Sequence, residues 1–259
     1  MLASEQIQAS AYITVKVIIG LSIMSDDLTS IEIEFIENAS IIVGIDEAGA
    51  GTLAGDLVVA GCILSKEHGI KGLDDSKKLS EKKREMLFDL IKDQALAFHI
   101  EHITPEDVDK SNIFACRMDG MRRCAEALAE ASHVIVDGDK IPHKMPKPTL
   151  AIIKADDKID CVRAASILAK VSHDRKMVLD GAAFPDFQFE KHKGYGTQLH
   201  KEMLDKHGPT PLHRMSYKPV MEAAKKHNTR IDIPTLKNTH DNSQAAAVNS
   251  QDDDFGFRF

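Results

Sequence analysis

Two adjacent carboxylates, Asp46 and Glu47, interrupt an apolar stretch that runs from residue 41 to residue 64. The apolar runs on either side have the length and composition of buried strands. A buried strand does not normally hold two unpaired acids, because removing a charge from water is costly. Positive charge is therefore expected beside them, and a divalent cation is its simplest source. The Ala-Gly-Ala-Gly sequence that follows would bend the backbone so that side chains on opposite faces of a strand approach one site.

Strand and helix patterns alternate along the middle of the chain. Two strands are predicted within residues 41–64, with further strands at 98–103, 133–136 and 150–153. Helices are predicted at 79–96, 113–131, 161–180 and 199–207, and a helix start at 104–109 with Pro105 in its first turn. Strands mixed with helices in this order predict an α/β layer structure.

Charge is distributed unevenly along a chain whose net charge is −7. Residues 140–227 carry 17 basic and 10 acidic side chains, whereas residues 41–139 carry 12 basic and 19 acidic ones. An acidic half that would hold metal thus precedes a basic half that would face phosphate. No apolar run reaches the length of a membrane span. The four cysteines show no metal-binding spacing, which favours buried thiols and a cytoplasmic location.

The two ends of the chain differ in composition from its middle. We expect residues 1–38 to be a poorly ordered extension, with Met24 as an alternative start, and residues 39–225 to form the catalytic domain. Residues 226–259 are expected to be a disordered tail, because they lack periodicity and are rich in Asn, Gln, Ser, Ala and Asp. The tail ends in DDDFGFRF, whose aromatic residues are a candidate docking motif for a protein partner.

Three further features accompany the adjacent acids. Asp137 ends the short run VIVD, and Asp156 follows the run that ends in Ile153. Acids delivered from separate strand ends are what a two-metal phosphoryl-transfer site requires, and oxygen ligands suit Mg²⁺ or Mn²⁺. The sequence HKGYGT adds a basic loop in which a tyrosine between two glycines would stack on a sugar or base.

Eight sequence blocks resemble bacterial ribonuclease HII, in the order in which that family carries them. They extend over about residues 41–220 and read GIDEAGAG, GLDDSKKLSEKKRE, VDKSNIFA, VDGDK, KADDK, RAASILAKVSHD, EKHKGYGT and HGPTPLHRMSYKPV. The resemblance implies a ribonuclease H-like α/β fold, with a mixed five-stranded sheet flanked by helices and a small helical C-terminal part. It also implies an endoribonuclease that hydrolyses the RNA strand of RNA–DNA hybrids. That enzyme would also cut 5′ of single ribonucleotides embedded in duplex DNA, in the removal of ribonucleotides from DNA.

Carried over position by position, the resemblance also implies the site residues. The catalytic acids and metal ligands would be Asp46, Glu47, Asp137 and Asp156. With Mn²⁺ or Mg²⁺ they would run a two-metal mechanism that leaves a 3′ hydroxyl and a 5′ phosphate. Backbone groups of the loop would read the ribose 2′-OH, a tyrosine would pack on the neighbouring deoxyribose, and other side chains would contact phosphates. These substrate-binding residues would be Gly49, Ala50, Gly51, Tyr195, Lys77, Ser166 and Lys193.

One departure from the family pattern favours an alternative function. The family usually carries Gly-Arg-Gly where this chain has Gly49-Ala50-Gly51, and alanine cannot replace the charge and donors of arginine. The alternative is therefore a hybrid-binding protein with weakened catalysis, although retention of all four acids argues for an enzyme. A hydrolase of small phosphoesters would not need the KGYGT and SILAKVSHD blocks. Ribonuclease HIII is disfavoured, because only about 40 residues precede the first block. We expect a monomer.

Overall fold

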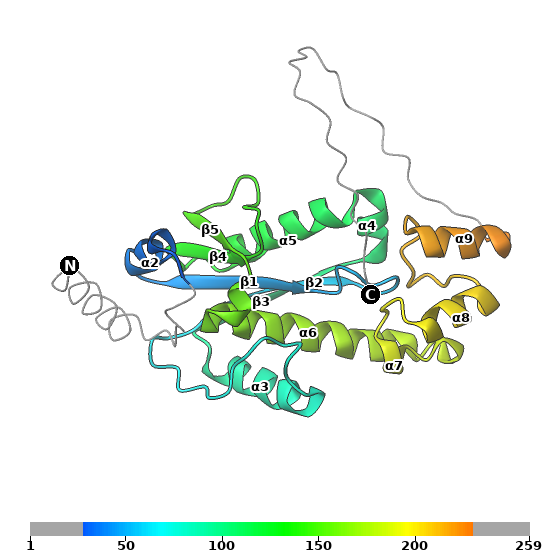
Figure 1. Cartoon of the computed structure of the whole chain (residues 1–259), viewed down its shortest axis with the longest axis horizontal. Helices are drawn as coiled ribbons and strands as arrows, with labels where there is room; N and C mark the ends of the chain where they lie inside the picture. Colours follow the sequence, from blue (N-terminus) through cyan, green and yellow to red (C-terminus); the bar gives the residue numbers. More distant parts are fainter. Residues whose placement is uncertain (1–27, 230–259) are drawn as a thin grey trace, which may run out of the picture.

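The computed structural model describes residues 28–229, and a five-stranded sheet forms its core (Figure 1). The strands are β1 (Ile42–Ala48), β2 (Leu57–Ile63), β3 (Ala97–Ile103), β4 (His133–Asp137) and β5 (Thr149–Ile152). They lie in the order β3-β2-β1-β4-β5. Because β1 pairs antiparallel with β2 and parallel with β4, the sheet is mixed, and the strand with the two adjacent acids lies at its middle. The predicted mixed five-stranded sheet is confirmed.

Helices cover both faces of this sheet (Figure 1). One face packs against α5 (Ile113–Ala127), which follows the short α4 (Pro105–Lys110), and the other packs against α3 (Glu81–Gln94) and α6 (Asp160–Gly181). Every residue of β2 is buried, because successive side chains enter the two cores in turn. Val59 packs in the core under α5, whereas Val58 and Ala60 pack in the core under α3 and α6.

Helix α6 lies unusually close to β1. A Cβ atom on Gly44 would lie only 2.4 Å from the backbone nitrogen of Val162, so only glycine permits this approach. Ile167, Leu168 and Val171 of the same helix are buried in the core. The close packing fixes α6 against the strand that carries Asp46 and Glu47.

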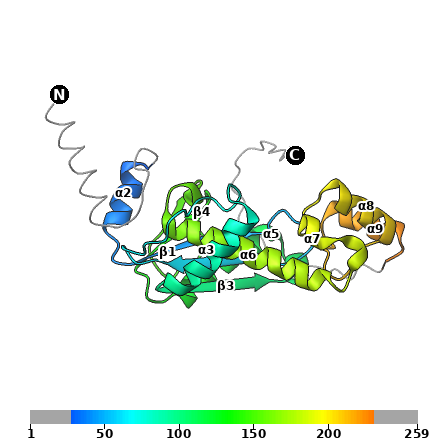
Figure 2. The ribbon, with the colours of Figure 1, turned by 90° about the horizontal axis from the view of Figure 1, so that it is seen from below.

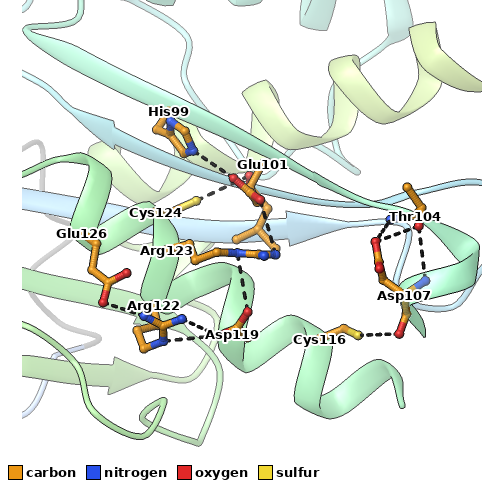
Figure 3. Close-up of polar contacts among 11 residues, drawn as sticks. His99, Glu101, Thr104, Asp107, Cys116, Asp119, Arg122, Arg123, Cys124 and Glu126 are labelled. Atoms are coloured by element: carbon orange, nitrogen blue, oxygen red, sulfur yellow. Dashed lines mark hydrogen bonds and ion pairs between the residues drawn. The ribbon is translucent and has the colours of Figure 1, made fainter. Parts of the chain in front are cut away.

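Side-chain caps explain where several helices begin. Thr104 and Asp107 form a reciprocal capping box at the start of α4, and Asn112 accepts from the backbone of Ala115 at the start of α5. Figure 3 shows this region and the polar contacts that link α5 to β3. Arg123 of α5 lies 3.3 Å from a carboxylate oxygen of Glu101 on β3.

Two expectations are corrected by the helices. The helix predicted at residues 113–131 ends at Ala127. Residues 1–38 were expected to be poorly ordered, but residues 30–37 form α2 (Ser30–Glu37), with a capping box at Thr29 and a fully buried Ile36. The rest of that extension, up to residue 27, lies outside the described residues. The four cysteines are buried and free, and within residues 28–229 no helix is long and apolar enough to cross a membrane.

A helical part lies at one end of the molecule (Figure 2). It contains α7 (Phe189–His192), α8 (Gln198–His207) and α9 (Lys218–Lys226), and the rings of Phe187 and Phe189 stack in its core. Two isolated β-bridges, Thr52 with Tyr195 and Ala54 with His213, join it to the connection between β1 and β2. The helical part is therefore joined directly to the loop that follows β1. The predicted tail lies almost wholly beyond the described residues.

Candidate active site

Asp46 and Glu47 lie at the C-terminal end of β1, just before its last residue, Ala48. Their partners show that they face opposite sides of the sheet, as strand alternation predicts. Asp46, only 4% exposed, interacts with the hydroxyl of Ser166 on α6. Glu47 forms an ion pair with Arg117 on α5, with 2.9 Å between Oε2 and Nε. The same arginine donates to the backbone carbonyl of Asp137 at 2.9 Å.

The other two predicted acids lie beside the first pair. Because Ile45 pairs with Val136 in the parallel ladder, the next residues, Asp46 and Asp137, are neighbours on adjacent strands. Asp137 Oδ1 accepts a 2.7 Å hydrogen bond from the backbone nitrogen of Ala155. This bond fixes the short turn η2 (Ala155–Asp157), which carries the buried Asp156. The structure thus places the four acids around the C-terminal ends of β1 and β4.

Burial and mutual repulsion disfavour the ionised forms of these acids. Burial, with repulsion from Glu47 and Asp137, raises the pKa of Asp46 well above its usual value. Burial also raises the pKa of Glu47, although the Arg117 guanidinium opposes the shift. Burial and the charge of Asp137 raise the pKa of Asp156 to about 6. A bound cation would relieve this repulsion and hold the carboxylates ionised.

The donor set fits hard divalent cations. Four carboxylates supply only oxygen ligands, which suit Mg²⁺ or Mn²⁺ rather than zinc. Among residues 28–229, however, no three acidic, histidine or cysteine side chains converge into a complete ligand cluster. Glu47 instead faces Arg117, and Asp156 lies 3.9 Å from the ammonium of Lys77. Asp46 contacts Ser166 on α6 and Glu47 contacts Arg117 on α5, so the expected approach of both acids to one site stays a prediction.

The predicted substrate loop lies against the predicted tyrosine. Gly49 has a φ of 82°, a left-handed conformation that glycine adopts without strain. The bridge between Thr52 and Tyr195 and the 2.8 Å bond from Leu53 N to Gly194 O hold the two segments together. Tyr195 is 36% exposed, so part of this residue is accessible to a ligand.

The three predicted phosphate contacts have different surroundings. Lys77 is largely exposed beside Asp156. Lys193 donates to the carbonyl of Glu190, and its ammonium lies 3.9 Å from Glu81. Ser166 is buried, and its hydroxyl lies 2.9 Å from that of Ser76 and interacts with Asp46, so its surroundings are those of a group that orients a carboxylate. Their contacts with phosphate stay predictions.

Sequence reasoning missed several residues that surround the site. Arg117 gave no signal, because it is one of several arginines on an amphipathic helix, and only the fold shows that it faces Glu47. Lys170 lies over the ring of Tyr195, 4.9 Å from its centre, and pairs with Asp174 at 2.8 Å. The ring of His173 also packs against Tyr195. The block SILAKVSHD carried these residues, but nothing in its pattern separates them from a solvated helix face.

The carboxylates lie at the C-terminal ends of the central strands of a mixed sheet that helices cover on both faces. These are the features of a metal-dependent hydrolase of the ribonuclease H type. The family model described as "Ribonuclease HII" matches residues 43–220. The chain belongs to the ribonuclease HII family.

Curated relatives and solved structures agree with this assignment. Ribonuclease HII of Marinomonas sp. (strain MWYL1) is 48% identical over 181 residues, which cover 70% of this chain and 91% of the relative. The Idiomarina loihiensis enzyme is 46% identical over 180 residues, covering 69% and 96%. Ribonuclease H2 from Pyrococcus horikoshii OT3 shares the fold, with a TM-score of 0.65 at 23% identity, covering 73% of this chain and all of that one. Ribonuclease HII in its PCNA complex from Archaeoglobus fulgidus gives a TM-score of 0.56 at 29% identity, covering 69% and 95%.

Proposed function

We propose that this protein hydrolyses the RNA strand of RNA–DNA hybrids and cuts duplex DNA on the 5′ side of single embedded ribonucleotides. The products would carry a 3′ hydroxyl and a 5′ phosphate. The observation that supports this best is that Asp46 and Glu47 lie next to Asp137 and directly precede the Gly49–Gly51 loop, which a β-bridge at Thr52 joins to Tyr195. A site that reads one sugar would then lie next to the groups that cut its phosphodiester.

Each part of the site would have a separate task. Asp46, Glu47, Asp137 and Asp156 would hold divalent cations, which supply an activated water and stabilise charge on the leaving 3′ oxygen. Arg117 holds Glu47 and the end of β4 in place from the side of α5. The loop would contact the ribose, because the 2′-OH distinguishes RNA from DNA. Tyr195, held by Lys170, would pack against the neighbouring deoxyribose.

The direct test is cleavage of an end-labelled DNA duplex that contains one ribonucleotide. With Mg²⁺ or Mn²⁺ we expect a single cut on its 5′ side, and none with a chelator or in the all-DNA duplex. An RNA–DNA hybrid of the same sequence should be cut at several positions. Binding of the ribonucleotide duplex without a cut under any metal condition would instead favour the alternative, a hybrid-binding protein.

Ala50 is the reason to keep that alternative. Replacing it by arginine is expected to tighten duplex binding about three- to tenfold, because one added phosphate contact contributes about 1 kcal/mol. The slope of log Kd against log salt should also steepen by about 0.9, since one more counterion is released. Titrations at several salt concentrations measure both quantities, and Ala50→Gln is the uncharged control of similar length. Equal affinity in Ala50→Arg and the original protein would show that Ala50 does not weaken binding.

Protein partners enter the proposal only through the C-terminal tail. The solved Archaeoglobus fulgidus relative is a complex with PCNA. We propose that the aromatic residues in DDDFGFRF dock on a protein partner of this chain. These residues lie outside the described part of the chain, so the support is the sequence and the relative's complex. A monomer and a cytoplasmic location also stay predictions.

A further inference from the structure

Arg214 is a fully buried arginine that has no carboxylate partner among the residues described. Its side chain is the largest of those that are completely buried. All three of its nitrogens donate hydrogen bonds, and nearly all of the acceptors are backbone carbonyls. A buried cation is costly unless its donors are satisfied, so this guanidinium depends on those carbonyls as much as it holds them. The carbonyls lie in the connection between β1 and β2.

The carbonyls that Arg214 binds belong to the predicted substrate loop. Nη2 donates to Gly49 O at 2.6 Å, and Nη1 donates to Ala50 O at 3.0 Å. Nε and Nη2 both reach Gly55 O, at 3.2 and 3.0 Å, where the connection enters β2. The guanidinium thus holds both ends of the connection between β1 and β2. Two successive peptide carbonyls of the loop, those of Gly49 and Ala50, point inward.

Tyr217 completes this arrangement. Its hydroxyl accepts from Arg214 Nη1 at 3.1 Å and donates to Ala50 O at 3.2 Å. The guanidinium carbon lies 5.4 Å from the centre of the tyrosine ring. Ala50 O therefore has two donors, both supplied by the segment between α8 and α9. The helical part of the molecule therefore holds the loop through the carbonyl oxygens of Gly49 and Ala50.

The inward carbonyls determine where the loop amides point. Within residues 28–229 every peptide bond is trans, so the N–H of each peptide points opposite to its C=O. With the carbonyls of Gly49 and Ala50 turned inward, the amides of Ala50 and Gly51 turn outward. Neither amide has a hydrogen-bond partner in the part of the chain described. A Cβ atom built on Gly51 would meet no atom within 4 Å, so the space beside Gly51 is open.

We propose that Arg214 and Tyr217 are positioning residues that present the Ala50 and Gly51 amides, as a pair of donors, to an oxygen of the nucleic acid. Two adjacent outward N–H groups form a small concave site for an acceptor oxygen. The oxygen is either the 2′ oxygen of the ribonucleotide or a phosphate oxygen. This inference rests on the proposed function for the identity of the ligand, and it rests on geometry for the direction of the amides.

Tyr217→Phe is the variant that tests this presentation. It keeps the ring that packs in the core but removes one of the two donors to Ala50 O. With the single-ribonucleotide duplex we expect KM to rise about fivefold while kcat stays within about twofold, because substrate contacts weaken and the acids are untouched. Ser216→Ala is the matched control, because it removes a 2.6 Å hydrogen bond to Asp109 from the same segment without touching the loop.

The matching all-DNA duplex, used as a competitive inhibitor, identifies the oxygen. If its inhibition constant is unchanged in Tyr217→Phe while KM rises, the amides contact the 2′ oxygen. If both constants rise together, the amides contact phosphate. An unchanged KM in Tyr217→Phe, or an equal rise in Ser216→Ala, would overturn the proposal. Arg214→Lys provides a second variant, and KM should rise more than about tenfold because an ammonium cannot reach all three carbonyls.

A measurement that does not depend on cleavage separates this inference from the proposed function. In amide NMR spectra of the intact protein, duplex binding should shift the Ala50 and Gly51 resonances, and Tyr217→Phe should reduce those shifts. If these shifts occur but no ribonucleotide is cut, the proposed function fails while the presentation of the amides stands. If the enzyme cuts and these two resonances do not move, the proposal about Arg214 and Tyr217 fails alone.

Discussion

Replacing Asp46 by asparagine is expected to reduce cleavage at least about 1,000-fold and to leave the metal-free protein as stable as before, or more stable. The activity loss follows because an amide is a poor ligand for a hard divalent cation and carries no charge to balance it. Stability is kept because Asp46 is buried against Glu47 and Asp137, whose charges repel it. Asparagine has the same shape and still accepts from the backbone nitrogen of Glu47, a 2.7 Å bond.

Single-turnover cleavage and thermal unfolding without metal measure the two effects. Asp157→Asn is the control, because Asp157 is adjacent to a predicted ligand but forms an ion pair with Lys78 near the surface. We expect that variant to keep most of its activity. A clear loss of stability in Asp46→Asn would show that repulsion among the acids is not a cost in the folded protein. Near-normal cleavage would remove Asp46 from the catalytic set.

Lowering the pH from 7 to 5 is expected to destabilise the protein by roughly 3 kcal/mol through two buried histidines. Burial lowers the pKa of His200 to about 4 and that of His213 to about 3, from 6.5. The unfolded chain therefore binds protons below pH 6.5 that the folded protein does not. The stabilising contribution is complete above that pH and is lost progressively as the pH falls toward about 4 for His200 and about 3 for His213.

The hydrogen bonds of this pair explain why it excludes protons. Thr210 N donates to His213 Nδ1 at 3.0 Å, so that nitrogen carries no hydrogen. His213 Nε2–H then donates to His200 Nε2, 3.0 Å away, and His200 Nδ1–H donates to Tyr195 O at 3.0 Å. A proton added to either ring would cost one of these bonds. Each ring is neutral, and every ring nitrogen of the pair is used.

Urea unfolding at pH 7 and at pH 5 tests this expectation. His213→Asn should be less stable at pH 7, because the bond to His200 is lost, but its stability should fall less between the two pH values. His143→Asn, at an exposed position, should retain the full pH dependence of the original protein. An equal fall in all three proteins would assign the acid sensitivity to other groups.

Local sequence patterns predicted most of the helices and strands, whereas contacts between residues far apart in the sequence could not be predicted. The strands around Asp46, the cap at Thr104 and the buried face of α6 each follow from neighbouring residues. The helix predicted to residue 131 ends at Ala127 because Leu128 and Ala131 turn into the core under the sheet, which periodicity does not reveal. Arg117 contacts Glu47, 70 positions earlier in the chain, and no local pattern shows such a contact.

The candidate site was likewise predictable from local patterns only in part. The four candidate acids could be proposed because they lie at or just after the ends of apolar runs, a feature visible within a few residues. The surroundings of Ser166 and the carbonyl contacts of Arg214 depend on which segments meet in space. Arg214 in particular lies in a block that resembles the family, yet its 165-residue separation from Gly49 hid its role. An arginine in a sequence is normally expected at the surface, and only the structure shows that Arg214 is buried.

The central place of β1 in the sheet has a consequence for how this protein can diverge. We expect substitutions in that strand to be constrained twice, since its residues pack the sheet and include two of the candidate catalytic acids. The helical part contacts the loop through two β-bridges, the Arg214 side chain, the Tyr217 hydroxyl and backbone hydrogen bonds, so we expect substitutions there to affect nucleic-acid binding more than the chemistry. We therefore expect related chains to keep the reaction while their substrate preference changes through residues of the helical part.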